Sequence, residues 1–351
     1  MLIKKIDFVL IISFVLALFS LILNFNLNLA YESINFKTII LLFIFMLSLK
    51  TLELNNTFIY LANKITSIFK SNLSITFAIT NTTFFLSMFI TNDVALIILI
   101  PFTLYMLQNI NINKILILSL QTIAANLGSS LSPFGNPQNI FIYTFYSLNL
   151  LEFIKIIYPY VLLSFLLLNI IIFIFFKPKK INIKNQKIKL KNSYIDYIVF
   201  LICILAVLNI VNINFAFIIV CFAIIFKNYK IFFMIDYTLL FTFIFLFIFV
   251  GLNIENLSKF LLFKDMVFNA ILLSNFISNV PATLLLHNFM NYQELLIGVN
   301  IGGLGTLISS MANLITFRLI KNQINRIKFL IIFSILNIIF LIILIVFYTI
   351  N

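Results

Sequence analysis

Charged side chains are scarce in this chain. They make up only 9% of its 351 residues, whereas hydrophobic residues make up 63% and the mean hydropathy is +1.18. A soluble domain needs more polar surface than this, so we predict an all-α polytopic membrane protein. The net charge of +13 comes from basic residues that flank apolar runs. That is the positive-inside pattern of membrane proteins, and it argues against nucleic-acid binding.

Groups for covalent or metal chemistry are also rare. The two cysteines, Cys203 and Cys221, lie in apolar segments without metal-ligand spacing or the density of a disulfide framework. The single histidine, His287, has no acid or thiol beside it in the sequence, so neither an enzyme nor a cofactor is expected. No Gly-x-x-x-x-Gly-Lys-Ser/Thr run is present, which disfavours an ATP-driven pump. A separate ATPase subunit stays open as an alternative that nothing supports.

Glycine is rare as well, and six of the seven glycines lie in or beside two similar stretches. The first is Asn126-Leu-Gly-Ser-Ser-Leu-Ser-Pro-Phe-Gly-Asn-Pro-Gln-Asn139, and the second is Asn300-Ile-Gly-Gly-Leu-Gly-Thr-Leu-Ile-Ser-Ser-Met-Ala-Asn313. Aligned without a gap, they share asparagine at both ends and a glycine at the third position. Helix packing through Gly298 and Gly302 is the simpler explanation of the second stretch. A polar, glycine-rich helix break in both halves instead indicates a transporter binding site.

Apolar runs predict about nine membrane crossings. Two crossings are interrupted by the glycine stretches, at 114–150 and 293–317. The segments 73–107 and 265–290 each carry a polar tripeptide in the middle and are predicted to be re-entrant hairpins that do not cross. The uninterrupted crossings are expected near 6–23, 36–50, 153–176, 194–211, 213–226, 237–250 and 328–350.

The distribution of basic residues supports this layout. With the N-terminus inside and the C-terminus outside, 19 of the 23 lysines and arginines fall on the cytoplasmic side. The exceptions are Lys37, Lys155, Lys259 and Lys264. A full crossing at either hairpin would invert everything after it and spoil this asymmetry, so the charges favour two hairpins.

The order of elements predicts two inverted repeats. Residues 1–176 form the first repeat, and a basic cytoplasmic linker follows at 177–193. Residues 194–351 contain an extra helix and then the second repeat, which enters the membrane from the opposite side. Inverted repeats place a binding site at their interface near the bilayer midplane.

The hairpin tips and the glycine stretches supply oxygen ligands of the kind that hard cations prefer. Na⁺ is the only metal ion that these ligands suggest. We expect two related cation sites, in which a tip faces a glycine stretch. The first comprises Thr91, Asn92, Asp93, Asn126, Gly128 and Ser132. The second comprises Ser278, Asn279, Asn300, Gly302 and Thr306.

Asp93 is the only acid well inside an apolar span. A carboxylate inside the membrane is costly and marks a candidate functional residue. It could bind sodium or carry a proton. The alternative is that Asp93 caps a helical arm starting at Val94, since Asp is a favoured N-cap.

Helix N-termini after each break suit an anionic group. The expected substrate ligands are Asn92, Pro133, Gly135, Asn136, Asn279, Gly303 and Gly305. These patterns predict a secondary transporter that moves a small inorganic or carboxylate anion, coupled to Na⁺ or H⁺. A cation–proton antiporter is the nearest alternative. An ion channel is an alternative of another class, although a channel would not need two inverted broken helices.

Three motifs in this order resemble the ion transporter superfamily: Thr91-Asn92-Asp93 with Pro101, Ser132-Pro133-Phe-Gly135-Asn136-Pro137-Gln138-Asn139, and Ser278-Asn279-Val-Pro281. The superfamily includes arsenite permeases, sodium–proton antiporters, citrate symporters and divalent anion–sodium symporters. The chain most resembles the uncharacterised bacterial anion permease branch with a citrate-transporter-like domain. The resemblance implies inverted repeats, ion coupling, an elevator-like motion, a homodimer and residence in the cytoplasmic membrane of a prokaryote.

The hairpin tips depart from part of that superfamily. The anion–sodium symporters carry Ser-Asn-Thr at both tips, whereas this chain has Asp93 at the third position of the first tip and Val280 at the third position of the second. Val280 removes a side-chain oxygen from the second cation site. The first tip is instead similar to the arsenite-permease branch.

Overall fold

The computed structural model describes residues 8–181, 188–191, 194–257, 262–320 and 324–350. This part of the chain is built from helices joined by short connections, and an isolated β-bridge joins Ser71 to Lys180. It confirms the predicted all-α membrane protein.

The helices follow the predicted order, and the two repeats contain matching sets. The first half contains α1 (Phe8–Leu23), α2 (Leu27–Glu32), α3 (Phe36–Leu54), α4 (Thr57–Thr66), α5 (Asn72–Ile90), α6 (Asn92–Met106), α7 (Lys114–Ser129), α8 (Pro137–Phe145) and α9 (Leu150–Phe175). The second half contains α10 (Tyr194–Val207), α11 (Ile213–Asn228), η1 (Tyr229–Phe233), α12 (Tyr237–Leu257), α13 (Met266–Ile277), α14 (Asn279–Leu286), α15 (Tyr292–Gly302), α16 (Met311–Leu319) and α17 (Arg326–Ile350).

Five helices in the described part are long and apolar enough to cross a membrane, or six if α3 and α4, which meet at a bend of 55°, form one span. The five are α5, α9, α11 with η1, α12 and α17. The prediction of nine crossings is larger because it includes shorter helices. It counted α1 and α10, which have 16 and 14 residues, and two broken crossings that are divided into shorter helices. The first hairpin differs from expectation in one respect, because its first arm, α5, has 19 residues and is long enough to span on its own.

Helix ends gather into two sets that match the predicted sides of the membrane. In the set predicted to be cytoplasmic, Ser71 pairs with Lys180, and the Lys191 N–H donates to the Asn55 carbonyl. In the opposite set, the Tyr292 hydroxyl donates to Glu152, and the Tyr348 hydroxyl donates to Asp265. Residues distant in sequence but predicted on one side therefore contact one another.

The two hairpins enter from opposite ends of the molecule. The first begins beside Ser71, and its second arm, α6, packs on α4, so both of its ends belong to the predicted cytoplasmic set. The second begins at Asp265, and its end at His287 accepts a hydrogen bond from Tyr146 in the opposite set. This opposition is the relation expected of inverted repeats.

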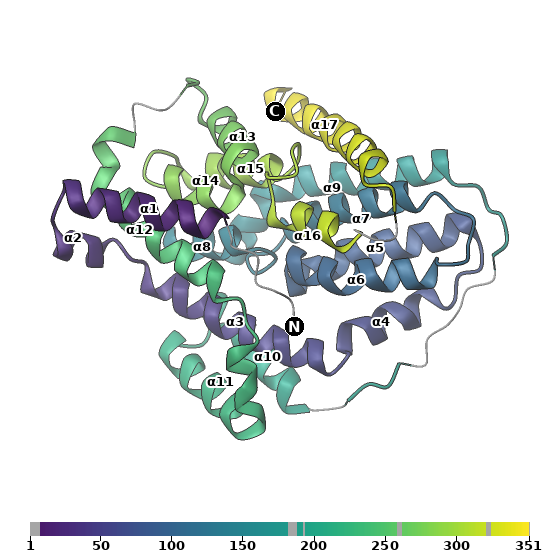
Figure 1. Cartoon of the computed structure of the whole chain (residues 1–351), viewed down its shortest axis with the longest axis horizontal. Helices are drawn as coiled ribbons and strands as arrows, with labels where there is room; N and C mark the ends of the chain where they lie inside the picture. The colour runs from purple at the N-terminus through teal and green to yellow at the C-terminus, as the bar shows by residue number, and fades with distance from the viewer. Residues whose placement is uncertain (1–7, 182–187, 192–193, 258–261, 321–323, 351) are drawn as a thin grey trace.

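After its break, each broken helix packs against the other repeat. The second piece of the first broken helix, α8, contacts α14 and α15, and the corresponding α16 contacts α6 and α7 (Figure 1). The two glycine stretches thereby meet at the centre of the molecule.

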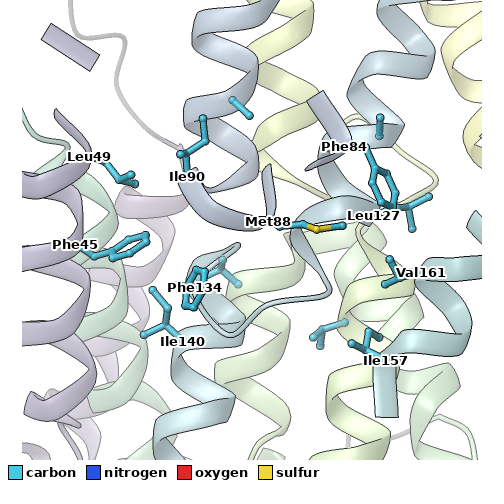
Figure 2. Close-up of a cluster of buried hydrophobic side chains, with 14 of the residues drawn as sticks. Phe45, Leu49, Phe84, Met88, Ile90, Leu127, Phe134, Ile140, Ile157 and Val161 are labelled. Atoms are coloured by element: carbon cyan, nitrogen blue, oxygen red, sulfur yellow. The ribbon is translucent and has the colours of Figure 1, made fainter. Parts of the chain in front are cut away.

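Apolar side chains hold the first break in place. Phe134, in the loop between α7 and α8, lies beside Phe45 of α3, with ring centroids 6.2 Å apart (Figure 2). Met88 of α5 and Leu127 of α7 belong to the same buried cluster, which continues to Ile157 and Val161 of α9. This packing fixes the first loop to helices on both sides of it.

Candidate functional site

Both hairpins break at one residue with a positive φ. Thr91 has φ 68° and ψ 147°, and Ser278 has φ 78° and ψ 151°. Neither is glycine, so each backbone is strained in the same way, and such strain concentrates at functional sites. A new helix starts at Asn92 and at Asn279 directly after the strained residue.

Each tip is bound to the broken loop of its own repeat by the same backbone hydrogen bond. The Asn92 N–H donates to the Gly135 carbonyl at 3.1 Å, and the Asn279 N–H donates to the Ser309 carbonyl at 3.0 Å. Gly135 and Ser309 occupy equivalent positions in the ungapped alignment of the two glycine stretches. The sequence similarity is therefore also a similarity of backbone contacts.

A second matched bond joins each loop to the first arm of its hairpin. The Ser132 hydroxyl donates to the Met88 carbonyl, and the Thr306 hydroxyl donates to the Asn275 carbonyl at 2.8 Å. Met88 and Asn275 each lie three residues before the strained residue of their tip. Ser132 and Thr306 thus hold their hairpins in place in this conformation.

Four asparagines exchange hydrogen bonds between the two repeats. The Asn126 amide donates to the Asn313 side-chain oxygen at 2.7 Å, and the Asn300 amide donates to the Asn139 side-chain oxygen at 2.8 Å. All four side chains are at least nine-tenths buried. We call these four residues the amide cross, because each bond runs from the end of one broken helix to the second piece of the other.

The remaining amides of the site connect to the cross. The Asn92 amide donates to the Asn126 oxygen at 3.1 Å, and the Asn136 amide donates to the Asn300 oxygen at 3.2 Å. The Ser310 hydroxyl donates to the same Asn126 oxygen at 3.0 Å. The first tip, both loops and both broken helices therefore belong to one buried polar network.

Two glycines let the broken helices approach their hairpins. A Cβ at Gly128 would lie 2.2 Å from the Phe84 carbonyl oxygen of α5, and a Cβ at Gly302 would lie 2.7 Å from the Ser274 Cβ of α13. Packing through small residues and the helix break therefore both explain these glycines.

Two of the expected substrate ligands, Asn92 and Asn279, lie at the hairpin tips, and the other five lie in or beside the two loops. Pro133 is buried, and a Cβ at Gly135 would lie 2.0 Å from the Ser129 carbonyl oxygen. The Gly303 carbonyl accepts hydrogen bonds from the Asn313 amide and the Ser309 hydroxyl. Gly305 has φ +108°, a conformation that L side chains rarely adopt.

Asp93 does not cap its helix. The N-cap is Thr91, whose side chain accepts from the Val94 N–H at 3.4 Å, and α6 already begins at Asn92. The capping explanation for Asp93 is therefore wrong. One carboxylate oxygen of Asp93, Oδ1, is buried and has no hydrogen-bond partner within the described residues. A buried carboxylate oxygen is stable only with a proton or a cation, which makes Asp93 available for either.

The second tip has a weaker ligand set. Val280 stands where the first tip has Asp93, and the Ser278 hydroxyl donates to its neighbour, the Asn279 oxygen, at 3.4 Å. The Asn279 amide lies over Gly303, 3.2 Å from the place a Cβ would take. Of the predicted second cation site, Ser278, Asn279 and Asn300 remain near the network, whereas exposed Thr306 faces the hairpin arm.

Sequence reasoning missed six residues of the network as ligands. Asn139 and Asn313 were visible as identities in the alignment and could have been included. Met88, Asn275 and Ser309 act through their backbone carbonyls, which side-chain identity does not reveal, and Ser310 corresponds to an asparagine. Within the described residues, no three His, Cys, Asp or Glu side chains gather into a metal site, so a cation here would be held by amide, hydroxyl, carbonyl and single-carboxylate oxygens.

The family model described as citrate transporter matches residues 1–291, which is most of the chain. The chain belongs to the citrate transporter family. It is 36% identical to an uncharacterized transporter of Methanocaldococcus jannaschii, over 90% of each chain. It is 31% identical to the inner membrane protein YbiR of Escherichia coli, over 83% of this chain and 82% of that protein.

Because the family and these relatives are transporters, this protein is a membrane transporter and not an enzyme. A third relative, named for the transporter arsB in Dictyostelium discoideum, is 31% identical over 47% of this chain and 30% of its own length. The superfamily resemblance expected from the three motifs is confirmed by these relatives.

Proposed function

We propose that this citrate transporter family member is a secondary active transporter in the cytoplasmic membrane of a prokaryote. It moves a small inorganic or carboxylate anion, and the movement is coupled to Na⁺ or H⁺. The observation that carries this proposal is the amide cross, which joins broken helices of two opposed repeats in one buried polar network. Binding sites of secondary transporters are built at such an interface.

The coupling ion binds at the first tip. Asp93 supplies the single charge, and its buried Oδ1 lacks a hydrogen-bond partner in the described part of the chain. Asn92 and Asn126 supply amide oxygens from the adjoining polar network, and Gly135 supplies a carbonyl. Oxygen ligands around one carboxylate suit Na⁺, and the same carboxylate can instead take up a proton.

The anion binds between the two loops. The helices α8 and α16 start there with Asn136 and Ser310 as N-caps, so two positive helix ends point toward the network. The two repeats are joined across it by neutral amide bonds, which can exchange for ligand contacts at small cost. This is the property that a site with alternating access requires.

The test is transport in reconstituted vesicles with an imposed Na⁺ or H⁺ gradient, using citrate and an inorganic oxyanion as separate substrates. We expect uptake or efflux that depends on one of the two gradients and is lost in Asp93→Asn. The matched control is Asp265→Asn, because Asp265 is exposed and is the N-cap of α13, a role that asparagine also fills. Unchanged coupling in Asp93→Asn would refute the role of this carboxylate.

Cation–proton antiport is the second candidate, and the unpartnered Asp93 oxygen favours it equally. An antiporter releases protons into the medium when Na⁺ is added and no anion is present. Proton release under those conditions, lost in Asp93→Asn and kept in Asp265→Asn, would replace anion transport with antiport.

A further inference from the structure

A cavity of about 440 Å³ opens where three helix connections meet, away from the amide cross. Its walls come from the start of α3, the turn between α8 and α9, and the turn between α10 and α11. The predicted topology places all three segments on the outer side of the membrane. The cavity therefore opens on one face of the protein, and we call this opening the mouth.

The charge of the lining favours a negative ligand. Half-buried Lys37 is the one charged side chain of the lining, and it has no ion-pair partner within the described residues. Ser147, Asn149 and Asn209 add polar groups at the rim. The carboxylate of the nearby Glu152 is already hydrogen-bonded, because the Asn149 amide and the Tyr292 hydroxyl each donate to one of its two oxygens.

A buried tyrosine gives the cavity a second, independent feature. Tyr143 is only 2% exposed, lines the cavity, and its hydroxyl makes no hydrogen bond in the described part of the chain. The hydroxyl oxygen is not itself fully enclosed, so it reaches the open space of the cavity and is available to a ligand. A hydrogen bond of 3.1 Å between Thr38 and Thr144 fixes the residues next to Lys37 and Tyr143 against each other.

The cavity and the amide cross share one helix. Asn139 of the cross and Tyr143 are four residues apart in α8, so they lie on the same face, one turn from each other. The helix that begins at the polar network thus ends at the cavity.

We propose that this cavity is an anion-binding vestibule, in which Lys37 and the Tyr143 hydroxyl hold a carboxylate or phosphate group. Its role as the approach to the amide cross rests on the proposed function, whereas anion binding in the cavity does not depend on that function. The anionic group could belong to a free anion or to a lipid headgroup, and the two sources are separated by experiment.

The test is the rate of cysteine labelling at the mouth. Ile210 lines the cavity and is 68% exposed, so Ile210→Cys is introduced after Cys203→Ala and Cys221→Ala remove the native thiols. Labelling is compared between an anionic and a cationic methanethiosulfonate reagent in phosphatidylcholine vesicles. Lys37→Gln should lower the anionic-to-cationic rate ratio about fivefold, as expected for one charge at roughly 8 Å in a water-like medium. Lys264→Gln, an exposed lysine that does not line the cavity, is the control and should leave the ratio unchanged.

Protection by ligand identifies the source. Citrate should slow labelling of Ile210→Cys, and this protection should be lost in Lys37→Gln and weakened in Tyr143→Phe. Protection by phosphatidylglycerol in the vesicles, with none from citrate, supports the same anion site with a lipid headgroup as its occupant. An unchanged reagent ratio in Lys37→Gln, with no protection from either source, overturns the proposal. Asp93→Asn should abolish coupling and leave the labelling ratio intact, so failure of the vestibule and failure of the transport proposal are distinguishable.

Discussion

The two halves of the polar network share their backbone contacts and differ in their side chains. In both halves the tip N–H binds a loop carbonyl and the loop hydroxyl binds the first hairpin arm. In both halves an asparagine at the end of the broken helix bonds to the opposite repeat. The shared contacts preserve the frame of the site, which leaves the side chains free to specialise.

The differences lie in charge and in burial. The first tip carries Asp93 where the second carries Val280. The first loop is packed on α3 through Phe134, which is 8% exposed, whereas the equivalent Ile308 of the second loop is 49% exposed. The half that carries the charged tip is therefore also the half with the more deeply packed loop.

The largest effect should come from the charge difference. Asp93→Asn is expected to lower gradient-driven transport about 10- to 100-fold, because hydrogen bonds and ion contacts of a charged group contribute roughly 1.5–3 kcal/mol. Val280→Ala, the equivalent position, should leave the gradient dependence intact. Initial rates in vesicles measure both. Equal losses in the two variants would show that the tips do not differ in function.

The burial difference should appear in stability. Phe134→Ala removes a buried ring and should cost about 3 kcal/mol, while Ile308→Ala should cost less than about 1 kcal/mol because its side chain is half exposed. Thermal unfolding in detergent compares the pair. A larger loss from Ile308→Ala would mean that the second loop is the better anchored of the two.

The helix contacts offer a smaller test at Gly128 and Gly302. Both alanine variants should be destabilised by about 1–3 kcal/mol, and Gly128→Ala more, because its Cβ would meet a backbone oxygen whereas that at Gly302 meets a side chain. Gly303→Ala is the control, since its nearest neighbour is the flexible Asn279 amide at 3.2 Å. Thermal shifts that do not separate Gly128→Ala from Gly303→Ala would contradict the close approach of α7 to α5.

The smallest effect concerns the two bonds of the amide cross. Double-mutant cycles with alanine at Asn126 and Asn313, and at Asn300 and Asn139, should each give a coupling energy of about 0.6 kcal/mol, a typical value for side-chain hydrogen bonds in membranes. Equal coupling energies in the two cycles would mean that the two hydrogen bonds contribute equally to the contact between the repeats. A coupling of zero in one cycle only would show that one of the bonds is not made in solution.

Much of the site could be predicted from sequence because its frame is repeated. Asn126 and Asn300, or Gly128 and Gly302, are recognisable as pairs once the two stretches are aligned. Met88, Asn275 and Ser309 contribute carbonyl oxygens, which any residue type can supply, so their role became visible only in the fold. Capping at the first tip was also undecidable from sequence, because Thr91 and Asp93 are both favoured caps and only the start of α6 distinguishes them.

The most direct test asks whether the two repeats meet at the amide cross. A protease site is inserted in the linker 177–193, and Asn126→Cys and Asn313→Cys are introduced after the native cysteines are replaced. Mercuric ion is bound tightly by two thiolates. It should bridge the two cysteines because the asparagines that they replace are hydrogen-bonded to each other. After cleavage in denaturing detergent, we predict that the two fragments stay joined in the double variant and separate in either single variant. Fragments that separate in the double variant would contradict a site shared between the repeats.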